Sequence, residues 1–117
     1  MGFFEITVFD EFDAAHFIKD MGKCEELHGH RFRVGIWVRS EKIDERGIAF
    51  DFRELKKILS SITKELDHKL LNDLPFFKNK SPSSENIALF IYERLKNLPI
   101  HKIEVWESPT SVVSFYP

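Results

Sequence analysis

The chain has 117 residues, of which 43% are hydrophobic and 31% charged, which is typical of one globular domain spanning residues 1–117. Its net charge of −2 argues against a nucleic-acid or membrane surface, and no apolar run approaches the roughly 20 residues that cross a bilayer. One cysteine cannot form an internal disulfide, and the N-terminus lacks a signal-peptide pattern. We therefore expect a cytoplasmic protein.

Two stretches of alternating side chains predict two long strands. Residues 4–16 carry mainly hydrophobic side chains at even positions and end at His16, and residues 28–39 repeat the pattern after His28 and His30. Because residues two apart share a strand face, all three histidines fall on the hydrophobic faces of strands that can pair as an antiparallel hairpin.

These three histidines predict a metal site. Imidazole nitrogen suits zinc, with iron, nickel and copper as alternatives. Three protein ligands leave one position open for water or substrate, as in catalytic zinc sites. Cupins also carry His-x-His on a strand, but they need a later glutamate on the same strand, and residues 31–39 contain none.

Cys24 lies in the loop 17–27, four residues before His28. As a fourth ligand it would close the zinc site and make it structural. As a free thiolate, which a nearby cation favours, it could remove a proton from a metal-bound substrate. A lone cysteine is also often a small buried hydrophobic residue.

Two helices and two strands follow. Asp51 at an N-cap and a hydrophobic stripe from Phe52 to Leu66 predict the first helix, and residues 81–86 predict the start of the second, with Pro82 in its first turn. Residues 101–107 and 111–116 alternate as strands. The order strand, strand, helix, helix, strand, strand predicts an α+β fold.

Three more polar residues are candidates for function. Asp67 and His68 place a carboxylate beside an imidazole, although a histidine at a helix C-terminus also interacts favourably with the helix dipole. Glu107 continues the inward parity of Ile103 and Val105. A carboxylate there can accept two parallel N–H bonds from a pterin or guanine edge, or it can lie at the strand end in solvent.

In combination, five motifs make the chain resemble the 6-pyruvoyl-tetrahydropterin and 6-carboxy-tetrahydropterin synthase family. They are Ala-Ala-His at 14–16, Cys-x-x-x-His-Gly-His at 24–30, Leu-Asp-His at 66–68, Pro-Ser-Ser-Glu-Asn at 82–86 and the glutamate at 107. The resemblance implies the tunnelling fold: a four-stranded antiparallel sheet (ββααββ) with two helices on its concave face. It also implies trimers closed into a barrel and stacked as a homohexamer, with the outward-facing aromatic residues Phe3, Phe9, Trp37 and Trp106 available for interfaces.

The resemblance further implies a reaction. The three histidines would bind Zn²⁺, and Cys24 would accept a proton with help from Asp67 and His68 across a subunit boundary. The enzyme would be a zinc-dependent carbon–oxygen lyase that eliminates triphosphate from 7,8-dihydroneopterin triphosphate. Glu107 would anchor the pterin ring.

Ser83 and Ser84 would lie near the same pocket. The short chain favours the branch that releases acetaldehyde and yields 6-carboxy-tetrahydropterin over the 6-pyruvoyl branch. However, the motif also reads Cys-x-Glu-x-His-Gly-His, and Glu26 could support aldolase-like cleavage to 6-hydroxymethyl-dihydropterin. A pterin- or purine-binding module with structural zinc is the third alternative. For the triphosphate, sequence position offers only Lys19, Lys23 and Arg31 as candidates.

Overall fold

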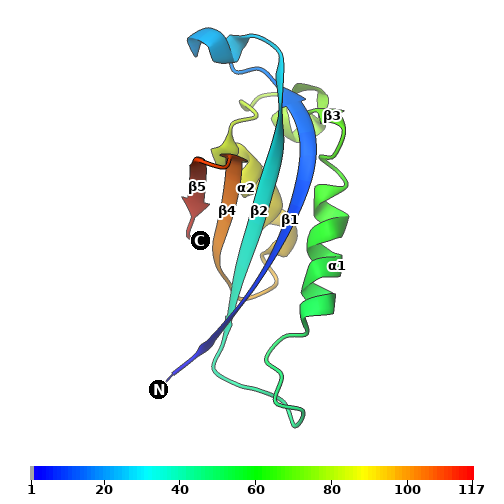
Figure 1. Ribbon diagram of the computed structural model, residues 1–117, viewed down its shortest axis with the longest axis vertical. Coiled ribbons are helices and arrows are strands. Elements are labelled where there is room, and N and C mark those ends of the chain that lie inside the picture. Colours follow the sequence, from blue (N-terminus) through cyan, green and yellow to red (C-terminus); the bar gives the residue numbers. More distant parts are fainter. Residues whose placement is uncertain (1) are drawn as a thin grey trace.

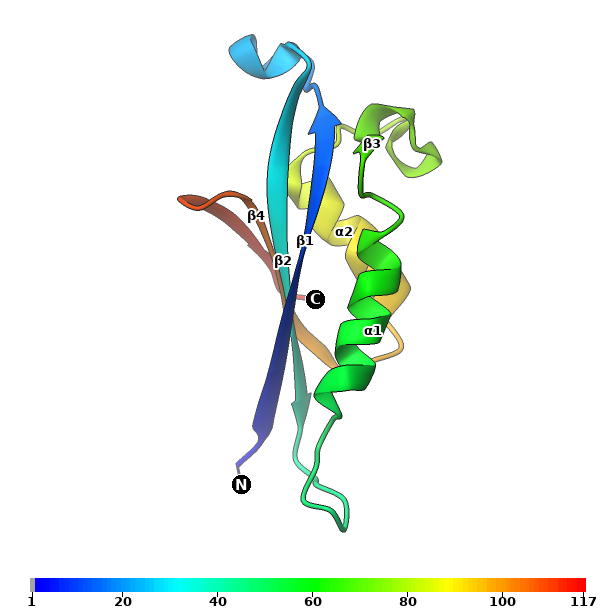
Figure 2. The ribbon, with the colours of Figure 1, turned by 45° about the vertical axis from the view of Figure 1, so that its right-hand side comes forward.

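The computed structural model describes residues 2–117, which form one mixed sheet and two α-helices (Figure 1). The elements in chain order are β1 (Phe4–His16), β2 (His28–Ser40), α1 (Phe52–Thr63), β3 (Lys69–Leu70), α2 (Ser84–Leu95), β4 (Ile100–Ser108) and β5 (Ser111–Phe115). The strand order is β3-β1-β2-β4-β5. Figure 2 shows both helices on the same side of the sheet, as expected for an α+β fold with helices on one face.

The β1–β2 hairpin is the longest part of the sheet and carries the three histidines. Its pairing runs without a shift from Phe4 opposite Ser40 to His16 opposite His28. The hydrophobic side chains of the inward parity are fully buried on both β2 and β4, namely Phe32, Val34, Ile36, Val38, Ile103 and Val105. Asp10 interrupts the inward hydrophobic row of β1, but Thr63 of α1 donates a hydrogen bond of 2.6 Å to its carboxylate.

Both helices begin at side-chain caps. Asp51 accepts a hydrogen bond from the backbone N–H of Arg53 at 2.8 Å, as its position before α1 predicts. Phe52, expected in the buried stripe, is 59% exposed at the first position of the helix, whereas Leu55 is buried. In α2 the cap is Ser83, so the expectation that Pro82 lies in the first turn is wrong.

The expectation of a four-stranded antiparallel sheet is also wrong. The fifth strand is β3, which pairs in parallel with β1 through Ala14 opposite Lys69 and Ala15 opposite Leu70. Two residues are too few to produce a hydrophobic alternation, so the sequence gives no sign of β3. Among residues 2–117 no helix has both the length and the apolar character needed to cross a membrane.

Candidate metal centre and active site

Three imidazoles from two strands form a compact cluster. His16 ends β1, and His28 and His30 begin β2 on the adjacent strand. The ring centroids lie 4.7 Å apart for His16 and His28, 5.3 Å for His16 and His30, and 4.8 Å for His28 and His30. One potential ligand atom from each ring lies within 4.8 Å of the other two. Two nitrogens bound to one ion at about 2.0–2.1 Å lie at most about 4.2 Å apart, so the three rings need to close by only a few tenths of an ångström to share an ion.

Hydrogen bonds to backbone carbonyls fix the tautomers of two rings. His16 Nδ1 donates to the carbonyl of Pro82 at 2.7 Å, and His28 Nδ1 donates to the carbonyl of Glu26 at 2.6 Å, because a carbonyl oxygen can only accept. The Nε2 atom of each ring then carries a lone pair. In metal sites, such carbonyl partners orient the imidazole and raise its basicity.

The electrostatics of the cluster favour neutral imidazoles. Burial lowers the pKa of His16 below its ordinary value of 6.5, and burial likewise lowers the pKa of His30. The Nε2 atoms of His16 and His30 are buried and have no hydrogen-bond partner among the described residues. Since buried polar atoms normally find a partner, these nitrogens fit ligands of a metal ion such as zinc.

Glu107 at the end of β4 faces the same cluster. Its carboxylate oxygens lie 3.7 Å from His16 Nε2 and 3.7 Å from His30 Nε2. The inward parity read from the sequence thus places this carboxylate beside the imidazoles, while its side chain stays 34% exposed. It can therefore reach a molecule bound beside the three histidines.

A cavity of about 430 Å³ is lined by Glu107 and by candidate residues from the loop 17–27 and from the start of α2. Cys24, Ser83 and Ser84 line it together with Glu107. Cys24 is a half-buried free thiol in a short 3-10 helix over Gly22–Glu25. Its sulfur belongs to neither of the two groups of potential metal ligands among residues 2–117, the three histidines and the trio Asp13, Asp67 and His68, which favours a free thiol over a fourth ligand.

Asp67 and His68 form an ion pair in which Asp67 Oδ2 lies 2.9 Å from His68 Nδ1. They meet because His68 has left the helix and adopts a left-handed φ of +58°. The backbone of Asp13 on β1 holds both residues: its N–H donates to Asp67 Oδ1 at 2.9 Å, and its carbonyl accepts from the His68 N–H at 2.6 Å. The first of these bonds is the main reason that the pKa of Asp67 is lowered.

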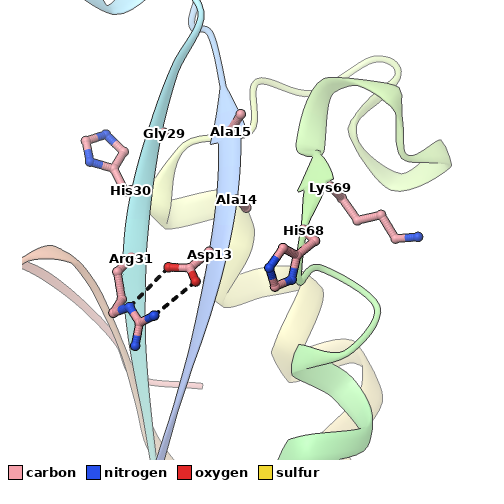
Figure 3. A pocket seen from close by; sticks show the side chains of 8 residues that line it. All are labelled: Asp13, Ala14, Ala15, Gly29, His30, Arg31, His68 and Lys69. Atoms are coloured by element: carbon pink, nitrogen blue, oxygen red, sulfur yellow. Dashed lines mark hydrogen bonds and ion pairs between the residues drawn. The ribbon is translucent and has the colours of Figure 1, made fainter.

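Within one chain this pair does not line the cavity of Cys24. It lines a different, open hollow of about 410 Å³, to which Asp13, Arg31 and Lys69 also contribute. Figure 3 shows His68 beside β1 and His30 beside β2, with the hairpin between them, and Arg31 bonded twice to the carboxylate of Asp13. The structure thus brings Cys24, Glu107, Ser83 and Ser84 together but leaves Asp67 and His68 apart from them.

Two contacts that support the site could not be read from the sequence. The Pro82 carbonyl orients His16, and Asn72 bonds both the N–H and the carbonyl of Phe17, the residue after His16, at 3.0 Å each. Asn72 lies after β3 in a segment without a recognisable motif, and its partner Phe17 is 55 positions away in the chain. No local pattern indicates a contact over that separation.

Comparison with known proteins gives one consistent family. The family model described as 6-pyruvoyl tetrahydropterin synthase matches residues 5–117. A dihydroneopterin monophosphate aldolase of Pyrococcus furiosus is 43% identical over 101 residues, covering 82% of each chain. A 6-carboxy-5,6,7,8-tetrahydropterin synthase of Synechocystis is 38% identical over 114 residues, covering 90% of this chain and 87% of the relative. The solved 6-pyruvoyl tetrahydropterin synthase of Caenorhabditis elegans superimposes with a TM-score of 0.90 at 27% identity, covering 100% of this chain and 97% of the other.

Proposed function

Because the chain belongs to the 6-pyruvoyl tetrahydropterin synthase family, we propose that it is a zinc-dependent lyase acting on 7,8-dihydroneopterin triphosphate, with elimination of triphosphate. The observation that carries this proposal is the cavity in which Cys24 and Glu107 meet beside the three histidines, two of which, His16 and His30, have buried Nε2 atoms without a hydrogen-bond partner. Of the two products, we propose 6-carboxy-tetrahydropterin, in line with the Synechocystis relative.

His16, His28 and His30 would hold the zinc ion, with the Pro82 and Glu26 carbonyls keeping two of the rings in the ligating tautomer. When bound, zinc supplies Lewis acidity to an oxygen of the substrate side chain. With these three histidines as the protein ligands and Cys24 outside their group, a fourth position would be available to that oxygen.

Glu107 would orient the pterin ring by accepting two parallel N–H bonds, which places the side chain of the substrate toward the histidines. Cys24, on the wall of the same cavity, would remove a proton from the carbon next to the polarised oxygen. Ser83 and Ser84 line the cavity, although the Ser83 hydroxyl also accepts the N–H of Asn86 as the cap of α2.

Asp67 and His68 would return or relay the proton from a neighbouring subunit, since within one chain they line a separate hollow. Two features support assembly through sheet edges. The outer edge of β5 has no partner strand among residues 2–117, and β1 pairs on its outer side with only two residues of β3. We propose a barrel-shaped trimer, stacked as a hexamer, in which such edges meet.

A second function is favoured by two observations. The Pyrococcus relative is a dihydroneopterin monophosphate aldolase, and this chain carries Glu26 two residues after Cys24. In that case the side chain would be cleaved to give 6-hydroxymethyl-dihydropterin. Glu26 is exposed and does not line the Cys24 cavity, which is why we place this function second.

Product analysis separates these functions. The zinc-loaded protein is incubated with 7,8-dihydroneopterin triphosphate, and the products are identified by mass. Acetaldehyde and inorganic triphosphate support the 6-carboxy branch, whereas a glycolaldehyde-type fragment with 6-hydroxymethyl-dihydropterin supports cleavage. Pterin binding without turnover of either the triphosphate or dihydroneopterin monophosphate would refute both and leave a binding module with structural zinc.

A further inference from the structure

A second cavity beside the metal centre is lined by lysines. It measures about 450 Å³ and lies between the loop that follows β1 and the loop that precedes α2. Its polar lining consists of Lys19, Lys78, Lys80, Asn72, Asn79 and Ser81. No acidic residue lines it, so its charge is uniformly positive.

The three lysines are free to receive an anion. Among residues 2–117 no salt bridge involves Lys19, Lys78 or Lys80; Lys80 instead places its Nζ 4.2 Å above the ring of Phe76. Glu93, whose pKa Lys80 helps to lower, already bonds Lys96 at 2.8 Å.

The other two cationic candidates from the sequence, Arg31 and Lys23, do not line this cavity. Arg31 makes two hydrogen bonds of 3.1 Å with the carboxylate of Asp13 and lies 3.7 Å from Glu11. Lys23 lines neither this cavity nor that of Cys24.

The lysine cavity adjoins the histidine cluster and the Cys24 cavity. Phe17 directly follows His16, Pro82 accepts the Nδ1–H of His16, and both residues line the cavity. Ser81 lines this cavity and also that of Cys24 and Glu107. The lysines therefore lie next to the cavity in which Glu107 would hold one end of a substrate, with Ser81 on the wall between the two cavities.

We propose that the cavity formed by Lys19, Lys78 and Lys80 binds the phosphate chain of the substrate. This assignment rests on the proposed function, because the substrate must carry its phosphates on the side chain that the histidines receive. Lysine ammonium groups are flexible point charges with three donors each, which suits a polyphosphate whose conformation changes as it leaves. Holding the phosphates here would fix the reacting carbons over the histidines and stabilise the charge of the leaving group.

Inorganic tripolyphosphate is the direct probe. Its affinity for the zinc-loaded protein is measured by calorimetry for the wild type, for the double variant Lys78→Gln with Lys80→Gln, and for Lys19→Gln. The matched control is Lys56→Gln with Lys57→Gln, which removes two exposed lysines of α1. Every variant keeps the three histidines, so any direct attraction of tripolyphosphate to zinc contributes equally to all four proteins.

We expect each lost lysine of the cavity to weaken tripolyphosphate binding by roughly three- to tenfold, more at low salt, and the control pair by less than twofold. The KM for dihydroneopterin triphosphate should rise by a similar factor, whereas binding of phosphate-free 7,8-dihydroneopterin should not change. Equal tripolyphosphate affinity in the wild type and the double variant, or equal losses in the control, would overturn the assignment. So would an equal loss of dihydroneopterin binding.

The binding measurements separate failure of the phosphate site from failure of the proposed reaction. Lysine-dependent binding of tripolyphosphate without turnover of the substrate would refute the lyase function and leave the anion site in place. Turnover with an unchanged KM in the double variant would refute the phosphate site and leave the lyase function in place.

Discussion

Replacing Asn72 by alanine tests whether the loop after β1 controls the metal centre. Asn72 makes two hydrogen bonds of 3.0 Å to the backbone of Phe17, next to His16. At about 0.5–1.5 kcal/mol of net stability each, their loss should cost about 1–3 kcal/mol. For a chain of this size that corresponds to a fall in Tm of about 4–12 °C.

The informative measurement is the rise in Tm on adding zinc, because a ligand that binds only the folded state stabilises it in proportion to the logarithm of its affinity. If Asn72 holds His16 in place, this rise is smaller in Asn72→Ala than in the wild type. Asn72→Asp should behave similarly, since it keeps the acceptor for the Phe17 N–H but puts a second acceptor against the Phe17 carbonyl. Asn97→Ala, at an exposed asparagine with no side-chain hydrogen bond in the described chain, is the control. A lower Tm with an undiminished zinc shift would show that Asn72 only stabilises the fold.

Three further outcomes are expected. Glu107→Gln should retain one zinc per chain, measured by atomic emission, while pterin affinity falls by at least tenfold; parallel loss of zinc would instead make Glu107 a ligand. Since burial lowers the pKa values of His16 and His30, the unfolded chain binds more protons than the folded chain below about pH 6.5. Zinc-free protein should therefore lose stability as the pH falls from 7.5 to 5.5, as measured by urea unfolding, and a pH-independent midpoint would contradict this. Mixing Cys24→Ala chains with His68→Ala chains, each inactive alone, should restore up to about one quarter of wild-type activity after reassembly if neighbouring subunits share each site, and none if one chain supplies both groups.

The sequence predicts those parts of the structure that depend on short repeats of hydrophobic side chains or on contacts between residues close in the chain. Alternation with period two places His16, His28 and His30 on one side of the hairpin and turns Glu107 toward them, and the unshifted pairing of β1 with β2 keeps them together. Asp51 likewise marks the start of α1 through a contact two residues away. In each case the residues that fix the geometry are neighbours in the chain or on adjacent strands.

The parts that could not be predicted depend on contacts between distant loops. The meeting of Asp67 with His68 requires a left-handed φ at a residue other than glycine, and β1 provides the hydrogen bonds that hold it. The lysine cavity joins Lys19 to Lys78 and Lys80, nearly 60 residues later. Net charge and composition describe the whole chain, so neither indicates which distant lysines come together.

The contacts of Glu26 suggest an experiment that decides whether Cys24 or Glu26 is the base. Its carbonyl accepts the Nδ1–H of His28, whereas its side chain is exposed and lies outside the cavity that Cys24 lines. Because Glu26→Ala removes the carboxylate and leaves that carbonyl in place, the variant should keep its zinc and the orientation of His28. Loss of turnover with full zinc content would then identify the carboxylate itself as the base and favour side-chain cleavage. If activity instead survives Glu26→Ala and disappears in Cys24→Ala, again with zinc retained, proton removal belongs to Cys24 and Glu26 contributes only its backbone.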